Sequence, residues 1–534
     1  MTFARPSRPP TSPAPTARVG VLVAALALAC GCRAVGPDYV RPAVPVPPQF
    51  RDAAAAAPTG AGPSGPSLAD LPWWQAFQDP ALQGLLRDGL AGNEDLRAAL
   101  ARVAEARARV GVAASERYPQ IDAGVSATRD RASRDLLSEG SRTTSTYRGT
   151  VSASWELDLW GRVRRGEEAA LADWMASEEG RRSVVVTLVG DIAEAYFDLR
   201  ELDEELAIAR ETRDTREKTL ELFTQRIGEG VSSRLETSQA EADLAFAAAT
   251  IPDLERRITQ QENLLSFLVG RTPGPVPRGR SLGAAALPPV LPTGLPATLL
   301  ERRPDVRAAE AEVIAANARV GVAVAEFFPR LDLLALVGLG TQELSGLSAD
   351  GSSFASVGGS LLAPIFQGGR LAGNRDAALA RRDEAVARFR RAAQNAFRDV
   401  ADQLAAVKGA RDARVQQERQ VAALGQALEL SSSRFSNGLA AYFEVLDAQR
   451  TLFPARLALA RTKRDQYVAL VRLYRALGGG WCSECFPCVT PPPIPDGTAG
   501  SPPPAGAAPP PPAPPSSPPP PARATRGPDA PPAR

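Results

Sequence analysis

The side chains that could do chemistry are few, and they form no catalytic set. The chain has 534 residues and no histidine, which removes the commonest general base and the commonest metal ligand. We find no nucleophile beside a base, no metal-ligand cluster and no phosphate-binding loop, so we expect no enzyme, no cofactor and no bound metal. The net charge of +2 gives no reason to expect a nucleic-acid partner.

Three cysteines near the end of the chain, Cys482, Cys485 and Cys488, share the spacing Cys-x-x-Cys-x-x-Cys. In an exported chain without histidine, a disulfide between two of them is favoured over a zinc site, and the third thiol has no assigned role. From about Thr490 the sequence is mostly Pro, Ala, Gly and Ser, which cannot bury enough apolar surface to fold. Residues 482–534 are therefore predicted to be a disordered tail.

Two further cysteines follow an apolar run near the start of the chain. The run Val19–Ala29 comes after several arginines and has the length of a signal peptide rather than of a membrane span. Cys32 follows a glycine, as at a bacterial lipoprotein cleavage site, so we predict a signal peptide over residues 1–31 and a lipid on Cys32. Cys30 is the alternative lipidation site, and a cleaved signal without a lipid is a second alternative. Arg33 is a non-acidic residue after Cys32, which favours the outer membrane of a Gram-negative bacterium.

The part of the chain between the two groups of cysteines contains an internal repeat, whose two copies lie about 210 residues apart. The same three blocks recur in the same order, which is very unlikely by chance. A period this long excludes a solenoid repeat and indicates that a whole structural unit was duplicated. The matching blocks are 97–122 with 307–332, 160–172 with 368–380, and 226–240 with 434–448.

Each copy contains a stretch in which apolar and polar residues alternate, as in a strand hairpin. We predict the hairpins at about 120–159 and 331–366. One interpretation is a soluble sheet that packs on a core. The other is a pair of transmembrane strands, which need about 9–11 residues each. The neighbouring helices look too long and too charged to cover an apolar face, which favours the membrane.

The strand number has a consequence for assembly. Two hairpins supply four strands, and four strands cannot close a barrel. An open sheet edge is not tolerated inside the hydrocarbon of a membrane. If the strands span a membrane, several chains must therefore share one barrel.

Very long helices follow each hairpin. Residues 163–227 contain no proline, and at about 1.5 Å per residue they would extend for roughly 100 Å. A dimeric coiled coil would explain this length but would not explain the strands. The helical pattern breaks at 228–233 and at 436–441, and then resumes. Each copy is thus predicted to be a strand hairpin flanked by long antiparallel helices that end in a tight turn.

Several segments, in order and at fitting spacing, resemble the TolC-like outer membrane factor family, and most of all its NodT-type lipoprotein branch. The resemblance covers about residues 30–481. The matching segments are Val35-Gly36-Pro37-Asp38-Tyr39, Trp73-Trp74 with Asp79-Pro80, Trp155 to Arg162, Glu301 to Val306, Ala363-Pro364-Ile365-Phe366, and Leu446-Asp447-Ala448-Gln449-Arg450.

The resemblance implies an α+β membrane protein with an internal duplication. In this family three chains each give four strands to a shared 12-stranded transmembrane β-barrel, which a long periplasmic α-helical barrel continues. Such trimers are passive exit ducts for small molecules such as drugs in tripartite efflux pumps. The implied partners are a homotrimer, a periplasmic adaptor, an inner-membrane transporter of the RND type and outer-membrane lipids.

The resemblance also implies a division of the chain. The predicted parts are a lipoprotein signal peptide over 1–31, a lipid-anchored extended segment over 32–72, a first efflux repeat over 73–270, a proline-rich equatorial linker over 271–298, a second efflux repeat over 299–481 and the tail over 482–534.

Two functional sites follow from the resemblance. The family closes the periplasmic end of its tube with constricting rings, which match Phe443, Glu444 and Asp447 here. Glu444 and Asp447 are three residues apart and share one helix face, so three copies would form a carboxylate ring that binds or passes cations. The first repeat has Leu235, Glu236 and Gln239 at the corresponding positions, which suggests that the second repeat forms most of the gate. The adaptor-docking tips are expected at Gly228, Gly230, Ser232, Asn437 and Gly438.

Two alternatives stay open from the sequence. The first is the exit duct of a type I protein secretion system, which belongs to the same class of channel. The second is a lipid-anchored periplasmic coiled-coil scaffold that has no pore. The substrate cannot be read from this chain, because the transporter and the adaptor usually select it.

Overall fold

The computed structural model describes residues 34–51, 79–131, 133, 143–229, 233–282, 296–348 and 350–479. These residues all belong to one compact unit, which ends at Cys482. Several predicted features lie outside the described residues. They are both candidate lipidation sites (Cys30 and Cys32), two tip residues (Gly230 and Ser232), most of the proline-rich linker (283–295), and the cysteine triplet with the tail (480–534).

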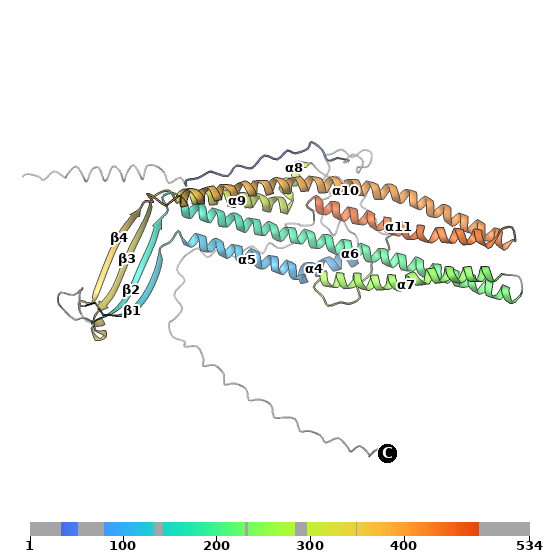
Figure 1. The fold of residues 1–534 in the computed structure, drawn as a ribbon, viewed down its shortest axis with the longest axis horizontal. Helices are drawn as coiled ribbons and strands as arrows, with labels where there is room; N and C mark the ends of the chain where they lie inside the picture. The colour runs from blue at the N-terminus through green and yellow to red at the C-terminus, as the bar shows by residue number, and fades with distance from the viewer. Residues whose placement is uncertain are drawn as a thin grey trace, which may run out of the picture. The chain divides into compact units, whose positions relative to one another are not determined.

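The order and lengths of the elements repeat, which confirms the duplication (Figure 1). Each copy has one helix of 67 residues and one of 35 residues after its strand hairpin. The first copy comprises α4 (Pro80–Gly92), α5 (Glu94–Ser115), β1 (Gln120–Arg131), β2 (Thr143–Leu157), α6 (Arg162–Gly228) and α7 (Arg234–Leu268). The second comprises α8 (Pro296–Arg302), α9 (Pro304–Ala325), β3 (Arg330–Thr341), the short helix η3 (Leu344–Ser348), β4 (Ser353–Leu362), α10 (Arg370–Ser436) and α11 (Tyr442–Ala476).

Local signals set the ends of the helices. Asp79 caps α4, and its side chain accepts hydrogen bonds from the amides of the first turn, with Pro80 as the first helical residue. Asn93 separates α4 from α5, because its side chain accepts from Leu96 N at 2.9 Å and caps the second helix. Helix α8 begins at Pro296, inside the predicted linker, since proline is well accommodated in the first turn of a helix.

The four strands form one antiparallel sheet in the order β1-β2-β3-β4. The central pair, β2 with β3, joins the hairpins of the two copies. The second hairpin ends at Leu362 rather than at the predicted residue 366, because Pro364 has no amide hydrogen to give to a ladder. The first hairpin ends at Leu157 rather than at the predicted residue 159. Its pairing stops there because the Asp158 side chain accepts hydrogen bonds from the amides of Val163 and Arg164 in the first turn of α6.

Helix α6 is the centre of the helical part. It packs against α4, α5 and α7 of its own copy and against α9 and α11 of the other copy. Its side chains Ile192, Tyr196 and Leu199 are completely buried. The Tyr196 hydroxyl donates to Asp79 Oδ2 at 2.9 Å and accepts from Gly279 N at 2.9 Å, which fixes the segment after α7 to α4 and α6. No helix in the described ranges combines the length and the apolar composition needed to cross a bilayer.

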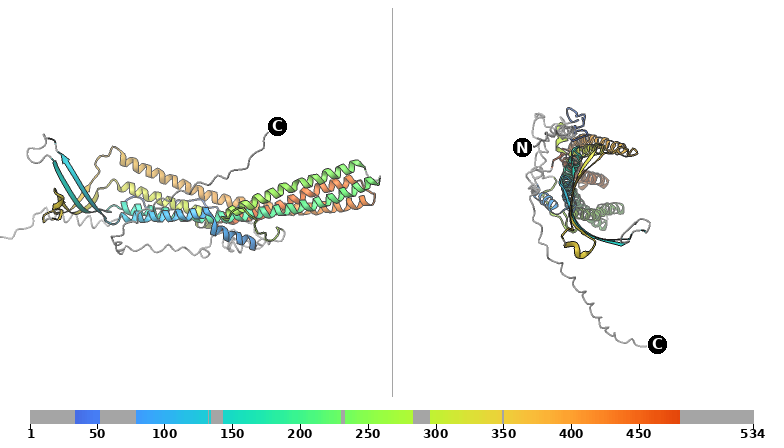
Figure 2. Two further views of the ribbon diagram at one scale, coloured as in Figure 1. Left: turned by 90° about the horizontal axis from the view of Figure 1, so that it is seen from below. Right: turned by 90° about the vertical axis from the view of Figure 1, so that its left-hand side faces the viewer.

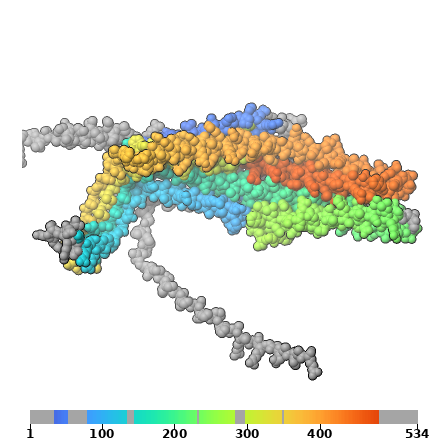
Figure 3. Space-filling view, in the orientation of Figure 1, coloured from blue at the N-terminus to red at the C-terminus, as the bar shows by residue number. Residues whose placement is uncertain are grey.

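The described part of the predicted extended segment, residues 34–51, is held against the helices. In Figure 3 it lies along the surface of α10, and Tyr39 and Val44 pack on a buried cluster of α8, α9 and α10. Val35 N donates to Trp160 O at 2.9 Å, just after β2. A Cβ atom on Gly36 would lie 2.5 Å from Gly321 Cα, so the close approach to α9 requires glycine. The start of this segment is therefore fixed beside the junction of sheet and helices.

Candidate functional site

The three predicted gate residues lie together on the exposed side of the first turns of α11. Phe443 is 65% exposed, and Glu444 and Asp447 are exposed as well. Tyr442 and Leu446, which fall on the other side of the same turns, are buried. The helical period thus separates one face that packs inside the chain from one that carries the predicted gate.

An aromatic cluster holds the start of α11 in place. The ring of Tyr442 lies 4.4 Å from that of Phe223 in α6 and 5.7 Å from that of Phe435 in α10, measured between centroids. Ala240 of α7 and Val445 and Leu446 of α11 complete the buried core of this cluster. All four long helices therefore support the residues that carry the predicted gate.

The two copies use the corresponding glutamates differently. In the first copy Ser233 and Glu236 form a capping box, in which Ser233 N donates to Glu236 Oε2 at 2.9 Å. In the second copy the capping position is Ala441, which has no side-chain oxygen, so Glu444 has no such role. The Glu444 carboxylate lies 3.8 Å from the exposed guanidinium of Arg434, and the Asp447 side chain makes no hydrogen bond or ion pair with any described residue. The second copy therefore has two exposed carboxylates on this face, neither of which caps the helix.

The described tip residues make tight turns. Gly228 is the last residue of α6, and Asn437 follows the last residue of α10. Gly438 has a φ of 71°, a left-handed conformation that ends the helix and favours glycine. The amide of Leu439 then donates to Arg434 O at 2.8 Å, which closes the turn. The geometry explains the glycine by the turn itself, and adaptor docking stays a prediction.

A buried ionic network between α6, α7 and α11 is not visible in the sequence. Arg216 of α6 and Asp243 of α7 have side chains that are 3% and 4% exposed, and Nε and Oδ2 lie 2.9 Å apart. Arg216 Nη1 also donates to Asp243 O at 2.8 Å, and Arg450 of α11 donates to Asp243 Oδ1 at 3.2 Å. Burial lowers the pKa of Arg216, which the charge of Asp243 opposes. In a helix rich in Arg and Glu, nothing marks these residues as interior ones.

A second buried feature is a pair of glutamates in α6, Glu201 and Glu205, which are four residues apart and both buried. Arg461 of α11 donates to Glu205 Oε1 at 2.7 Å and lies 3.8 Å from Glu201 Oε1. Arg257 of α7 lies 3.5 Å from Glu205 Oε2. The pKa of Glu201 is raised from 4.5 to about 7. The larger cause is burial of its carboxyl group, and the second is the negative charge of Glu205.

This carboxyl pair predicts a pH-dependent stability. The pKa of Glu201 is higher in the folded chain than in the unfolded chain, so its contribution to stability is complete below about pH 4.5. That contribution is lost as the pH rises through about 7. Glu201→Gln mimics the protonated acid, so we expect a higher melting temperature than wild type at pH 8 and a similar one at pH 5.

Thermal unfolding of the purified protein, followed by circular dichroism at both pH values, measures this effect. Glu204→Gln is the matched control, because Glu204 lies three residues after Glu201 in the same helix and its carboxylate pairs with Lys463 at 2.7 Å rather than with a second acid. A pH dependence of Glu201→Gln equal to that of wild type would contradict the assignment.

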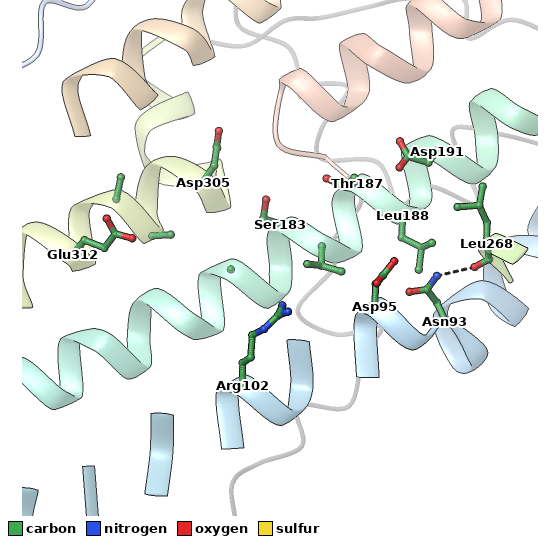
Figure 4. A pocket seen from close by; sticks show the side chains of 14 residues that line it. Asn93, Asp95, Arg102, Ser183, Thr187, Leu188, Asp191, Leu268, Asp305 and Glu312 are labelled. Atoms are coloured by element: carbon green, nitrogen blue, oxygen red, sulfur yellow. Dashed lines mark hydrogen bonds between the residues drawn. The ribbon is translucent and has the colours of Figure 1, made fainter. Parts of the chain in front are cut away.

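A cleft of 620 Å³ lies between α5, α6 and α9, away from the predicted gate (Figure 4). Four acids line it: Asp95, Asp191, Asp305 and Glu312. Arg102 and the hydroxyls of Ser183 and Thr187 face the same space. It contains none of the predicted site residues, and no described group of three or more acids or cysteines is placed to hold a metal ion.

The sheet has one apolar face that no described helix covers (Figure 2). The register places the alternate residues that begin with Ile121 in β1, Leu157 in β2, Leu331 in β3 and Leu361 in β4 on this face. Val125 at one edge is 90% exposed and Val357 at the other edge is 88% exposed. The opposite face carries mostly Ser, Thr, Gly and charged residues. The two edge strands, β1 and β4, each pair on one side only.

An uncovered apolar sheet that continues into long helices is the architecture of an outer-membrane channel protein. The sequence matches the family described as outer membrane efflux protein over residues 85–271 and 295–479. This chain belongs to that family, which is a family of channels rather than of enzymes. It is located in the outer membrane and serves as an exit duct for efflux.

Named relatives agree with this assignment. The toluene efflux pump outer membrane protein TtgI of Pseudomonas putida is 38% identical over 461 residues, which cover 86% of this chain and 97% of the relative. The cation efflux system protein CusC of Escherichia coli is 33% identical over 458 residues, with 86% and 97% covered. The open MtrE outer membrane channel of Neisseria gonorrhoeae superposes with a TM-score of 0.76 at 32% identity, covering 84% of this chain and 98% of MtrE.

Proposed function

We propose that three copies of this chain form one tube that exports small molecules across the outer membrane. The uncovered apolar face of the sheet, with its two unpaired edges, carries the proposal. In water this face would have to be covered, and in lipid its edges would have to be paired. Insertion into lipid would remove the apolar face from water, and joining β1 of one chain to β4 of the next chain would pair the edges.

Barrel size supports an assembly of three chains. Two chains would give eight strands, and the interior of an eight-stranded barrel is filled by its own side chains. Three copies give twelve strands, which leave room for a lumen lined by the polar face of each sheet. The helices would continue this tube into the periplasm, because α5, α6, α9 and α10 each connect directly to the sheet.

The partners follow from the position of the tips. A periplasmic adaptor would bind the tips, including Gly228, Asn437 and Gly438, and would connect the tube to an inner-membrane transporter of the RND type. Solvent, toluene and cation efflux are named for the relatives, which supports small-molecule export over type I protein secretion. A poreless scaffold would leave the apolar sheet face in water. The lipid on Cys32, or on Cys30, would hold the start of the chain in the membrane.

Three copies of Phe443, Glu444 and Asp447 would surround the axis at the periplasmic end. The glutamates and aspartates would bind cations, and the phenylalanines would narrow the opening. This role suits the exposed face at the start of α11, which no helix in the described part of the chain covers.

Planar-bilayer recording tests the duct directly. We expect the purified full-length protein to be a trimer in detergent by native mass spectrometry and to insert as discrete conductance steps. A folded monomer that gives no conductance would overturn the proposal and favour the scaffold. A conducting trimer whose current does not respond to divalent cations would support the duct and contradict the gate.

A further inference from the structure

The apolar face of the sheet carries only two charged residues over the whole length of its four strands. Both are arginines, Arg129 and Arg131, and both lie at the end of β1. The other charged residues of the strands, Asp122, Asp130, Arg148, Glu156, Arg330 and Asp332, all fall on the opposite face. Asp130 lies between the two arginines in sequence, so the alternation sends both cations to one face and the acid to the other.

The register gives the height of these arginines. Arg129 pairs with Ser145 and Arg131 with Thr143, just beyond the pair of Ala127 and Tyr147. At about 3.3 Å per residue, Arg129 lies about 26 Å along the strand from Ile121, or about 20 Å along the membrane normal at the usual tilt. Arg131 lies about 5 Å higher again. Because the apolar band of a transmembrane barrel is about 25 Å tall, the arginines lie at its edge.

Aromatic residues on the same face mark both edges of the band. Trp155 lies near the helical end of the sheet, where its indole donates to Arg117 O at 3.0 Å. Tyr147 lies eight residues away in β2, next to the level of Arg129. Aromatic side chains at both levels are typical of the two interfaces of a membrane. The guanidinium groups would then lie at the height of lipid headgroups.

In the described part of the chain the two guanidinium groups have no protein partner. Neither the Arg129 nor the Arg131 side chain makes a hydrogen bond or an ion pair with any described residue, and both residues are exposed. At headgroup height a guanidinium faces lipid phosphates, and its planar fork binds phosphate oxygens in pairs. Exposed arginines are usually just solvated, but these two are the only charges on the lipid-facing side of the four described strands.

The N-terminal segment indicates which leaflet these arginines face. Ala34 lies against Gly161, where a Cβ atom on the glycine would be 2.4 Å from Ala34 Cβ, at the helical end of the sheet. The lipid predicted on Cys32, or on Cys30, would place this end of the sheet, from which the helices continue, beside the periplasmic leaflet and the Arg129 end beside the outer leaflet. We propose that Arg129 and Arg131 bind the phosphate groups of lipid A, the phosphorylated glycolipid anchor of lipopolysaccharide in the outer leaflet. The inference rests on the proposed function, which places the apolar face in lipid.

Binding of lipid A to the intact trimer tests the site. We would compare wild type, Arg129→Gln with Arg131→Gln, and the control Arg148→Gln in detergent by native mass spectrometry. Arg148 suits the control because it lies near the same level on the opposite face, paired with Ser126. We expect wild type and Arg148→Gln to retain lipid A, and the double variant to bind it at least about fivefold more weakly.

Two further lipids identify the source of the phosphate. Dephosphorylated lipid A should bind all three proteins equally weakly, and phosphatidylglycerol should not distinguish them. Equal lipid A binding by the double variant and wild type would overturn the inference. A double variant that loses phosphatidylglycerol binding as strongly as lipid A binding would also overturn it, because the arginines would then form a general anion site.

Conductance of the same samples separates this inference from the proposed duct. A double variant that still forms conducting trimers but no longer binds lipid A would support both the duct and the lipid A site. A wild-type protein that neither trimerises nor conducts defeats the duct itself.

Discussion

Replacing both gate carboxylates, by Glu444→Ala with Asp447→Ala, should remove the block of ionic current by divalent cations. In the proposed trimer the change deletes six carboxylates around one axis. A carboxylate about 4 Å from a unit cation contributes about 4 kcal/mol at an effective dielectric constant of 20. Because 1.4 kcal/mol corresponds to a tenfold change in affinity, we expect the blocking concentration to rise by at least about tenfold. Single-channel recording with magnesium added on the periplasmic side measures it.

The first copy provides the matched control for this experiment. Glu236 occupies the position that corresponds to Glu444, but its carboxylate closes a capping box with Ser233. Glu236→Ala should therefore destabilise the start of α7 by about 1 kcal/mol and leave the cation block unchanged. If the double variant keeps both the conductance and the block of the wild type, the gate assignment is wrong. Loss of block in Glu236→Ala would instead place the first copy in the gate as well.

Replacing Asp243 by alanine should cause the largest loss of stability of any single change in the helical part. It leaves the buried guanidinium of Arg216 without its counter-charge, and removing one partner of a buried ion pair typically costs about 3–5 kcal/mol. The change also removes the acceptor of Arg450, which connects α11 to the same network. A fall in melting temperature and faster cleavage of the helical tips by protease are the expected results.

An exposed ion pair between the same two helices serves as the control. Arg210 of α6 and Glu255 of α7 lie 2.7 Å apart with side chains about half exposed, and such pairs contribute about 0–1 kcal/mol. Glu255→Ala should therefore change the melting temperature little. Arg216→Met with Asp243→Leu should recover much of the loss, because it removes both buried charges. Equal effects of Asp243→Ala and Glu255→Ala would show that burial of the pair does not determine its contribution.

Much of the fold could be predicted from the sequence because its signals are local. The period of two in β1 to β4 and the period of 3.6 in α6 and α10 are each visible within a single element. The matching blocks showed the duplication, and the breaks at 228–233 and 436–441 placed both turns. The errors occur at strand ends: Asp158 accepts hydrogen bonds from the first turn of α6, and Pro364 has no amide hydrogen for the ladder.

The candidate gate was only partly predictable. The spacing of Glu444 and Asp447 put them on one face, and the structure confirms that this face is exposed. The difference between Glu444 and Glu236 comes from a neighbouring residue, Ala441 in one copy and Ser233 in the other, which decides whether the carboxylate is used as a cap. That contrast could have been read from the capping-box pattern.

By itself the sequence determined the duplication, the elements of each copy and the alternation that makes one face of the sheet apolar. Only the tertiary structure decided that β2 pairs with β3, that α6 packs against α9 and α11 of the other copy, and that Arg216, Asp243 and the pair of Glu201 with Glu205 are interior. The physical reason is the separation along the chain over which each kind of interaction acts. Periodicity and capping act within a few residues along the chain. Burial of a charge depends on which distant helix lies opposite, and an arginine in α6 has the same sequence neighbours whether it faces water or Asp243.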